Sequence, residues 1–249
     1  MNFTILRFDE IASTNTEALD QARRGAGEGL CVTANRQTAG RGRRGRTWIS
    51  PPDAGLYFSI VLRPRIEIKF LPLLTLMTAA AVHDTLETLF DIECDIKWAN
   101  DLHSKDKKIC GILAETAETS KGLAVVIGIG INLKSANFPS ELEEIATSIE
   151  AETGAAPDAE ILLPALTKVF SDYYDVLQSG GGAAKIRTAW AERSSYFSGK
   201  TVKVQLAGET IFGTTRGIEE NGALRVETST GEIKIIHAGD VERVRIVKS

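Results

Sequence analysis

The chain has 249 residues, a length that accommodates one large domain or one domain with a smaller companion. Hydrophobic residues make up 43% of the sequence and charged residues 25%, which is typical of globular proteins and excludes collagen-like and mostly disordered chains. The formal net charge of −4 does not favour a protein that coats nucleic acid. The cysteines, Cys31, Cys94 and Cys110, form no CxxC pair, so neither a disulfide framework nor a zinc knuckle is expected.

The beginning of the sequence and its apolar windows carry no targeting signal. Residues 1–14 contain one arginine, two acidic residues and no sustained apolar stretch, so they do not predict a signal peptide. The most apolar windows, 70–82 and 123–133, are shorter than the ~20 residues that a membrane helix needs or are interrupted by glycines. We therefore expect a cytoplasmic protein without a membrane segment.

Periodicity in the first half of the chain predicts helices over 14–24 and 70–90, and strands over 30–34, 56–62, 95–98, 108–115 and 123–132. Thr14 and Glu17 have the spacing of a capping box at the start of the first helix. Pro72 is tolerated in the first turn of the second helix. Gly111, Gly128 and Gly130 are predicted where a side chain would crowd a neighbouring backbone or a ligand.

The second half changes character near Tyr196. An acidic segment over 141–160 leads into predicted helices over 159–177 and 183–192. Short strands divided by glycine-containing turns follow at 201–206, 210–218, 223–227, 232–236 and 241–247. Five short strands in about fifty residues predict a small β-barrel or sandwich. The expected domains are therefore residues 1–195 and 196–249.

The densest chemical signal is the segment 36–48, RQTAGRGRRGRTW. It contains five arginines and three glycines but no acidic residue: Arg36, Arg41, Arg43, Arg44, Arg46, Gly40, Gly42 and Gly45. Glycines let a backbone approach a ligand closely, and guanidinium groups bind phosphate or carboxylate through paired hydrogen bonds. The pattern favours anion binding, with mobility expected in the empty loop. A solvated surface loop and non-specific nucleic-acid binding are the alternatives.

Other common site motifs are missing from the sequence. There is no GxxxxGK[ST] loop, no G-x-S-x-G elbow and no dinucleotide fingerprint around Gly128. The remaining polar residues in apolar surroundings are 97–101, 107–108 and Asn132. A lysine beside a strand is usually edge decoration, and Asn100 and Asp101 taken alone are usually turn residues.

Taken together, these segments resemble the biotin protein ligases. The resemblance is carried by STN at 13–15, GRGRRGRTW at 40–48, KWANDL at 97–102, KKICGILAE at 107–115, GIGINL at 128–133 and the tail motifs IFGTTRGIEENGAL and HAGDV. It implies an α+β fold: a mixed β-sheet catalytic domain with packed helices, of the class II synthetase-like biotin/lipoate ligase type, and a small C-terminal SH3-like β-barrel.

The resemblance also implies a set of site residues. It assigns biotin contacts to Ser13, Thr14, Asn15, Gln37, Gly40, Arg41, Gly42, Arg43, Lys108 and Gly111. It assigns the ATP or adenylate side to Arg43, Arg46, Trp48, Asn100, Lys108 and Asn132. The expected catalytic residues are Lys108, Arg41, Arg43 and Asp101, and no metal ligands are identified. Trp48 either stacks on an adenine or is an ordinary buried tryptophan, and Asp101 either positions an amine or has a structural role.

The implied reaction uses ATP, with Mg²⁺, to convert biotin into biotinyl-5′-AMP. Biotin is then transferred to a lysine of a biotin carboxyl carrier protein, such as that of acetyl-CoA carboxylase. Cationic side chains suit this chemistry because a carboxylate must approach a phosphate, two groups of the same charge. A closed loop would keep water from the reactive anhydride.

The sequence departs from the family pattern at two points. Ala99 replaces the proline of KWPNDL, which predicts a modest change in turn rigidity. Only about a dozen residues precede Ser13, so we expect a monofunctional ligase without specific DNA binding. A homodimer is left open.

Two rival functions remain. They are a lipoate–protein ligase and an RNA- or DNA-binding module that uses the arginine-rich segment.

Overall fold

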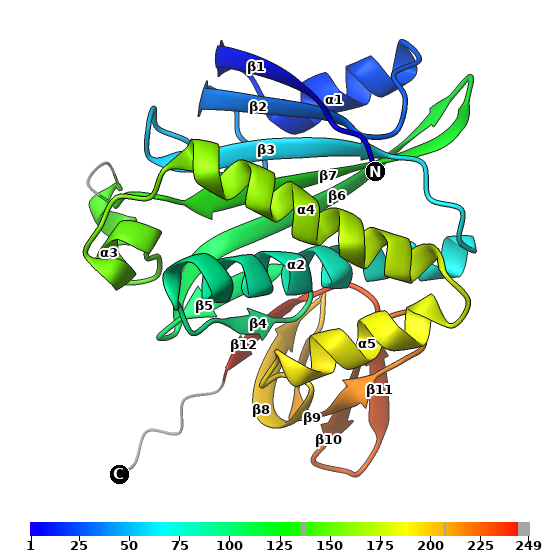
Figure 1. The fold of residues 1–249 in the computed structure, drawn as a ribbon. Helices are drawn as coiled ribbons and strands as arrows, with labels where there is room; N and C mark the ends of the chain where they lie inside the picture. The colour runs from blue at the N-terminus through cyan, green and yellow to red at the C-terminus, as the bar shows by residue number, and fades with distance from the viewer. Residues whose placement is uncertain (136–137, 207, 244–249) are drawn as a thin grey trace.

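The computed structural model describes residues 1–135, 138–206 and 208–243. In this part of the chain the larger sheet has seven strands in the order β1-β2-β3-β7-β6-β5-β4 (Figure 1). They are β1 (Thr4–Ile11), β2 (Leu30–Gln37), β3 (Gly55–Leu62), β4 (Asp95–Lys97), β5 (Asp101–Ser104), β6 (Lys107–Thr119) and β7 (Gly122–Asn132). β1 and β2 pair in parallel and the other neighbours pair antiparallel, so the predicted mixed sheet is confirmed.

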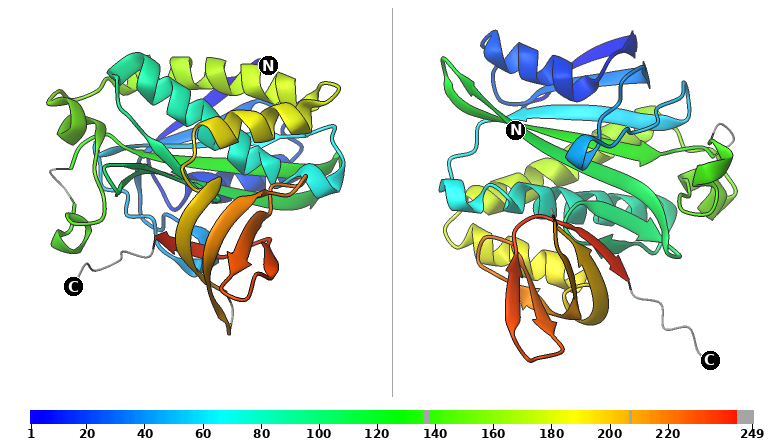
Figure 2. Two further views of the ribbon diagram at one scale, coloured as in Figure 1. Left: turned by 90° about the horizontal axis from the view of Figure 1, so that it is seen from below. Right: turned by 180° about the vertical axis from the view of Figure 1, so that it is seen from behind.

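Helices cover both faces of this sheet, as the two views of Figure 2 show. Helix α1 (Thr14–Arg23) packs on one face against small and branched side chains, among them Val61, Ala124 and Val126. The other face lies under α2 (Leu73–Phe90), α4 (Ala159–Gln178) and α5 (Gly182–Glu192), with Phe58, Ile60, Ile127 and Ile129 in that core. Alternate residues of β7 thus serve opposite cores, because side chains alternate across a strand. Each large apolar side chain buried here contributes ~1.5–3 kcal/mol.

Helix α1 begins one residue earlier than the predicted capping box. Ser13 is the N-cap, with extended backbone, and its Oγ accepts a hydrogen bond from the Thr16 N–H at 3.5 Å. Thr14 is the first helical residue, and its side chain contacts Gln37 and Ser59 instead. The prediction that Thr14 caps the helix is therefore wrong, and the Thr14 hydroxyl belongs to a network at the helix start.

Strands β1 and β5 are absent from the predicted elements. β1 is a half-exposed edge strand with a weak alternation of buried and exposed residues, so its periodic signal is faint. β5 has only four residues and begins at Asp101. It follows Asn100 and the Trp98–Ala99 peptide bond, which is cis.

The long helix begins at Leu73, with Pro72 as its N-cap, after a 3-10 turn (Ile68–Phe70). A short helix, α3 (Ile149–Thr153), lies in the acidic segment.

A second, curled antiparallel sheet follows α5, in agreement with the expected small barrel. In the described residues it has the order β11-β10-β9-β8-β12. Its strands are β8 (Ser198–Gln205), β9 (Thr210–Ile218), β10 (Leu224–Thr228), β11 (Ile233–Ile236) and β12 (Asp240–Arg243). The end of the predicted strand 241–247 lies outside the described residues, and the division at residues 195 and 196 stays a prediction. No helix in the described ranges has the length and apolar character needed to cross a membrane.

Candidate active site

Three glycines make room for side chains on the α1-covered face of the large sheet. Gly111 of β6 pairs directly with Gly130 of β7, and Gly128 lies two residues further along the same strand. A Cβ at Gly128 would lie 2.2 Å from Oδ1 of Asn15, and one at Gly130 would lie 2.5 Å from the ring of Trp48. The two side chains therefore rest directly on the backbone of the sheet. The expectation that a side chain at these positions would crowd its surroundings is thus confirmed, but the groups crowded are side chains and not the predicted backbone or ligand.

Lys108 reaches the same face because of an irregularity in β6. Leu102 of β5 pairs with Cys110, whereas the next residue, His103, pairs with Lys108, which leaves Ile109 as an extra residue. Side chains alternate along a strand, so the extra residue places Lys108 on the face of Gly111 instead of the opposite one.

The ammonium group of Lys108 is held over the glycines by two partners. Its Nζ lies 2.8 Å from Oδ1 of Asp101 and 5.3 Å from the centroid of the Trp48 ring. A Cβ at Gly111 would lie 3.1 Å from Lys108 Cε. Lys108 is thus a half-buried cation above the sheet, and the interpretation of this lysine as edge decoration is wrong.

The segment 38–48, here named the Arg loop, finds its acidic partners far away in the sequence. Arg41 donates to Glu115 of β6 at 2.6 Å, and Arg44 and Arg46 pair with Asp240 at the start of β12. Arg43 donates to Oδ1 of Asn100 at 2.6 Å. Burial lowers the pKa of Arg43, and the carboxylates of Asp101 and Asp240 partly offset this effect. An arginine side chain stays protonated in proteins, so Arg43 is a cation at this end of the loop.

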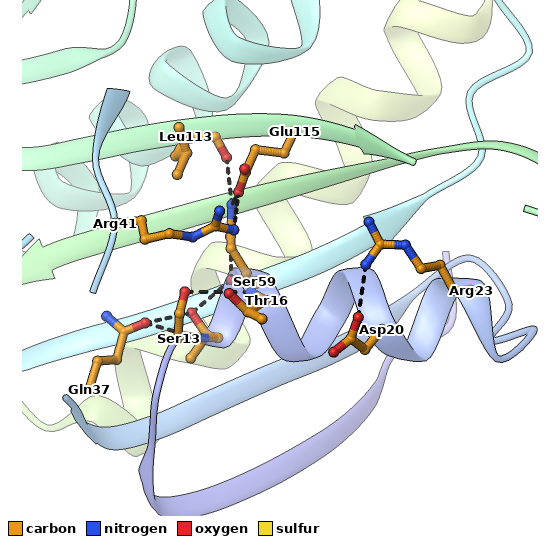
Figure 3. A network of polar contacts seen from close by, with 11 residues as sticks. Ser13, Thr16, Asp20, Arg23, Gln37, Arg41, Ser59, Leu113 and Glu115 are labelled. Carbon is orange, nitrogen blue, oxygen red and sulfur yellow. Dashed lines mark hydrogen bonds and ion pairs between the residues drawn. The ribbon is translucent and has the colours of Figure 1, made fainter. Parts of the chain in front are cut away.

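Hydroxyl and amide groups gather at the other end of the glycine row, around the N-terminus of α1. Oε1 of Gln37 accepts hydrogen bonds from the Thr14 N–H at 2.9 Å and from Thr14 Oγ1 at 3.2 Å. Ser59 Oγ donates to Oδ1 of Asn15 at 2.6 Å and lies 2.8 Å from Thr14 Oγ1. Figure 3 shows Ser13, Gln37 and Ser59 converging at the start of this helix.

One cavity joins these groups, and most of the predicted site residues line it: Ser13, Thr14, Asn15, Gln37, Arg41, Gly42, Arg43, Arg46, Trp48, Asn100, Asp101, Lys108 and Gly111. The sequence singled out Gly128 and Gly130 only as close-approach positions, and both line the cavity. It gave no site role to the remaining lining residues, Thr47, Tyr57, Ile112, Leu113, Ile129 and Asp240. The residues around Asp240 gave no indication that this side chain would line a cavity formed by distant strands.

Gly40 and Asn132 support the cavity without lining it. A Cβ at Gly40 would lie 2.3 Å from the carbonyl oxygen of Trp48, so the two ends of the Arg loop touch there. Nδ2 of Asn132 donates to the carbonyl of Thr147 at 2.9 Å and to that of Lys108 at 3.3 Å. These contacts hold the chain segment next to Lys108.

The chemical character of the cavity changes along the glycine row. Asn15 lies over Gly128, whereas Trp48 and Lys108 lie over the Gly111–Gly130 pair. Two residues along a strand span ~7 Å, so the hydroxyl and amide groups are separated from the cations by about that distance. Such a cavity can hold an elongated molecule with a neutral polar group at one end and an anionic group at the other.

No resident metal site is evident among the lining residues. The carboxylates of Asp101 and Asp240 face the cavity, and each is already paired with a lysine or with arginines. In the described ranges a group with metal-ligand spacing is found on α2, at His83, Asp84 and Glu87, none of which lines the cavity.

Comparison with known proteins assigns the chain to a family. Residues 8–132 match the Biotin/lipoate A/B protein ligase family and residues 197–244 match the Biotin protein ligase C terminal domain. The chain is 38% identical to the Bifunctional ligase/repressor BirA of Bacillus spizizenii, over 94% of this chain and 72% of that protein. It is 35% identical to the Biotin–[acetyl-CoA-carboxylase] ligase of Paracoccus denitrificans, over 92% of this chain and 96% of that protein.

A solved structure with the same arrangement is the biotin protein ligase of Aquifex aeolicus in complex with biotin and ATP. The two chains superpose with a TM-score of 0.84 and 29% identity, over 96% of this chain and 99% of the other. The motifs, the fold and the cavity on the glycine row agree with these similarities. The chain belongs to the biotin protein ligase family.

Proposed function

We propose that this protein activates biotin with ATP to form biotinyl-5′-AMP and then transfers biotin to a lysine of a biotin carboxyl carrier protein, such as that of acetyl-CoA carboxylase. The observation that carries the proposal is the polarity of the cavity. Hydroxyl and amide groups lie at one end of the glycine row, and Arg43 and Lys108 lie at the other. Biotin has a neutral ureido ring at one end and a carboxylate at the other, and this polarity matches that of the cavity.

The ureido ring is assigned to the end formed by α1 and β2. A ureido group has one carbonyl acceptor and two N–H donors, which hydroxyl and amide side chains can pair. Ser13, Thr14 and Gln37 line this end, and Asn15 forms its floor above Gly128. Gly42 belongs to the loop above the cavity, and Gly40 supports biotin binding by closing the base of that loop.

The adenylation step needs positive charge where the two anions meet. A carboxylate oxygen of biotin attacks the α-phosphorus of ATP, the bond from this phosphorus to the bridging oxygen breaks, and pyrophosphate leaves. Lys108 and Arg43 are the cations placed to neutralise the approaching groups. Arg41 is assigned to the loop that covers the reactants, because its guanidinium is already paired with Glu115.

The nucleotide is assigned to the end near Trp48 and the C-terminal sheet. The indole N–H of Trp48 is buried and has no hydrogen-bond acceptor among the described residues, so it can donate to a bound ligand. Arg46 lines the same end, Asn100 holds Arg43, and Asn132 secures the backbone of Lys108. Because the cavity carboxylates are already neutralised, we propose that Mg²⁺ enters as part of the MgATP substrate.

The transfer step uses a neutral lysine amine of the carrier protein. The amine attacks the acyl carbon of biotinyl-5′-AMP and an amide bond forms. The nitrogen loses a proton to solvent, and AMP leaves with the electrons of the broken acyl–oxygen bond. Asp101 lies at the cationic end of the cavity, so we assign it the positioning of the incoming amine or of Lys108. The absence of sequence-specific DNA binding stays a prediction. A homodimer stays an open alternative.

The decisive experiment is ATP-dependent transfer of biotin to a purified carrier domain. Incorporation of biotin that depends on ATP and on the carrier lysine is the expected result. A parallel reaction with lipoate tests the related ligase activity, and preferred transfer of lipoate would contradict the proposal. Filter binding of RNA and DNA at physiological salt tests the remaining rival, and tight nucleic-acid binding without biotin transfer would replace the ligase function.

A further inference from the structure

Glu115 lies outside the cavity lining, yet it joins two parts of the site. Its Oε2 accepts a hydrogen bond from Nη2 of Arg41 at 2.6 Å and another from Nδ2 of Asn15 at 2.9 Å. The Glu115 side chain is only 25% exposed. In Figure 3, Glu115 reaches from β6 toward Arg41, and the two side chains meet above the start of α1.

Asn15 offers Glu115 an immobile attachment point. The Asn15 side chain is buried, its Nδ2 also donates to the Leu113 carbonyl at 3.3 Å, and its Oδ1 accepts from Ser59 at 2.6 Å. The backbone of Gly128 lies directly beneath the amide, so the side chain cannot shift in that direction. Both polar atoms of Asn15 are thus engaged, and the residue acts as part of the rigid sheet.

Arg41, unlike the buried Asn15, belongs to a surface loop. It lies between two glycines in a loop whose arginines repel one another, and its side chain is 40% exposed. A charge-assisted hydrogen bond is shorter and about twice as strong as a neutral one, which gives the Arg41–Glu115 contact the strength to hold such a loop. Among the described contacts, this one connects the loop to the rigid floor of the biotin end.

We propose that Glu115 is a positioning residue that docks the Arg loop over the biotin end of the cavity through Arg41. The inference rests on the proposed function and adds a residue to it. The ion pair holds the Arg41 guanidinium at the biotin end, whereas Arg43 and Lys108 lie at the cationic end, where the reactants are proposed to meet. Removing Arg41 alone would leave Glu115 as an uncompensated anion beside a site for anionic substrates.

The test compares Glu115→Ala and Glu115→Gln with Glu118→Gln, which neutralises an exposed glutamate on the same strand. Biotin-dependent exchange between ATP and pyrophosphate gives kcat and the KM for biotin. Bystander labelling reports the escape of biotinyl-5′-AMP. For Glu115→Ala we expect the KM for biotin to rise about 10-fold, with kcat within about 3-fold of wild type and increased labelling of an unrelated protein. Glu115→Gln should show a smaller rise, because its amide oxygen still accepts hydrogen bonds.

A double-mutant cycle separates positioning from general destabilisation. If Glu115 acts through Arg41, Arg41→Ala/Glu115→Ala should have a KM for biotin no higher than that of Arg41→Ala. Additive increases in KM would overturn the inference, as would a Glu115→Ala variant with the KM of Glu118→Gln. If Glu115→Ala does not fold, as judged by circular dichroism, the same comparisons with Glu115→Gln decide. A wild-type protein without biotin-dependent exchange would instead contradict the proposed function.

Discussion

The glycines under the cavity show how single atoms determine what this site can hold. At Gly111, Gly128 and Gly130 the missing Cβ atoms leave the volume that Lys108, Asn15 and Trp48 occupy. The interior of a protein is packed nearly as densely as an organic crystal, so an added methyl group must displace a neighbour. Substitution of these glycines should therefore act on ligand binding more than on the fold.

Gly130→Ala should weaken ligand binding. The new Cβ would lie 2.5 Å from the Trp48 ring, which must move toward the cavity. The displaced indole would enter the end of the cavity assigned to the nucleotide, so we expect the affinity for ATP to fall by about 10-fold, which corresponds to ~1.4 kcal/mol of binding free energy. Titration calorimetry with ATP and with biotin measures the effect. Gly27→Ala is the matched control, because a Cβ there meets nothing within 4 Å, and equal affinities of the two variants would contradict the prediction.

Lys108→Ala should slow adenylate formation while leaving the fold intact. The ammonium group is half-buried beside Asp101, and its proposed partners are anions that arrive only with the substrates. Removing one such contact in an enclosed site lowers the rate by a factor on the order of 10²–10³. Single-turnover formation of biotinyl-5′-AMP is the measurement. Lys107→Ala provides the control, since the side chain of the neighbouring Lys107 donates to the carbonyl of Glu143 and does not line the cavity. Identical rates for both variants would remove Lys108 from the chemistry.

At the scale of the elements, the carboxylate of Asp84 connects the three helices α2, α4 and α5. Asp84 belongs to α2 and accepts hydrogen bonds at 2.5 and 3.0 Å from Arg193, which directly follows α5. It also accepts one at 2.8 Å from Tyr173 of α4. Burial opposes the charged form, but hydrogen bonds from His83, Arg193 and Tyr173 outweigh it and lower the pKa of Asp84 well below its usual range. The charged form is therefore favoured in the folded protein.

Asp84→Asn should lower the free energy of unfolding by about 2 kcal/mol at pH 7. Because the folded-state pKa is lowered, this contribution is present above the unfolded value of about 3.9 and is lost as the pH falls through the lower folded value. The difference between wild type and variant should consequently shrink below pH 4. Urea unfolding at pH 7 and at pH 3 measures it. Asp175→Asn, at an exposed position of α4, should change stability by no more than about 0.5 kcal/mol, and a pH-independent difference for Asp84→Asn would refute the linkage.

For the molecule as a whole, the C-terminal sheet closes one side of the site. Asp240 of β12 pairs with Arg44 and Arg46 of the Arg loop, and Arg44 also donates to the carbonyl of Gln205 at 3.0 Å. Elsewhere, Nε1 of Trp98 donates to the carbonyl of Gly222 at 2.9 Å. The C-terminal sheet is therefore tied to the catalytic part through the Arg loop and through Trp98 as well as through α5.

Asp240→Asn should loosen the Arg loop. Without the carboxylate, Arg44 and Arg46 lose their acidic partner and repel one another, so the loop should sample open conformations more often. We expect faster trypsin cleavage after these arginines, by about 3- to 10-fold, with protection restored by biotin and MgATP. Mass spectrometry of the fragments measures the site and the rate. Glu232→Gln neutralises an acidic residue elsewhere in the same sheet, and a similar cleavage rate in both variants would show that Asp240 does not restrain the loop.

Local patterns in the sequence determined most of the elements and the chemical character of the site. Helices α1, α2, α4 and α5 follow from apolar periodicity. The glycines singled out as close-approach positions are indeed crowded, although by side chains and not by the predicted backbone or ligand. The expectation that the Arg loop binds anions likewise depends only on its own arginines and glycines, and it stays a prediction. These features are visible because they depend on residues within a few positions of one another.

The partners of the loop were decided only by the tertiary structure. Glu115 is 74 residues from Arg41, and Asp240 is 194 residues from Arg46. The expectation that the empty loop is mobile counted only acidic residues nearby in the sequence, so it missed these carboxylates. The bulge at Ile109, which turns Lys108 toward the cavity, and the edge strand β1 likewise depend on which strands become neighbours. Strand order is a property of the packed sheet and not of any one segment, because central pairs such as β3 with β7 join strands that are distant in sequence.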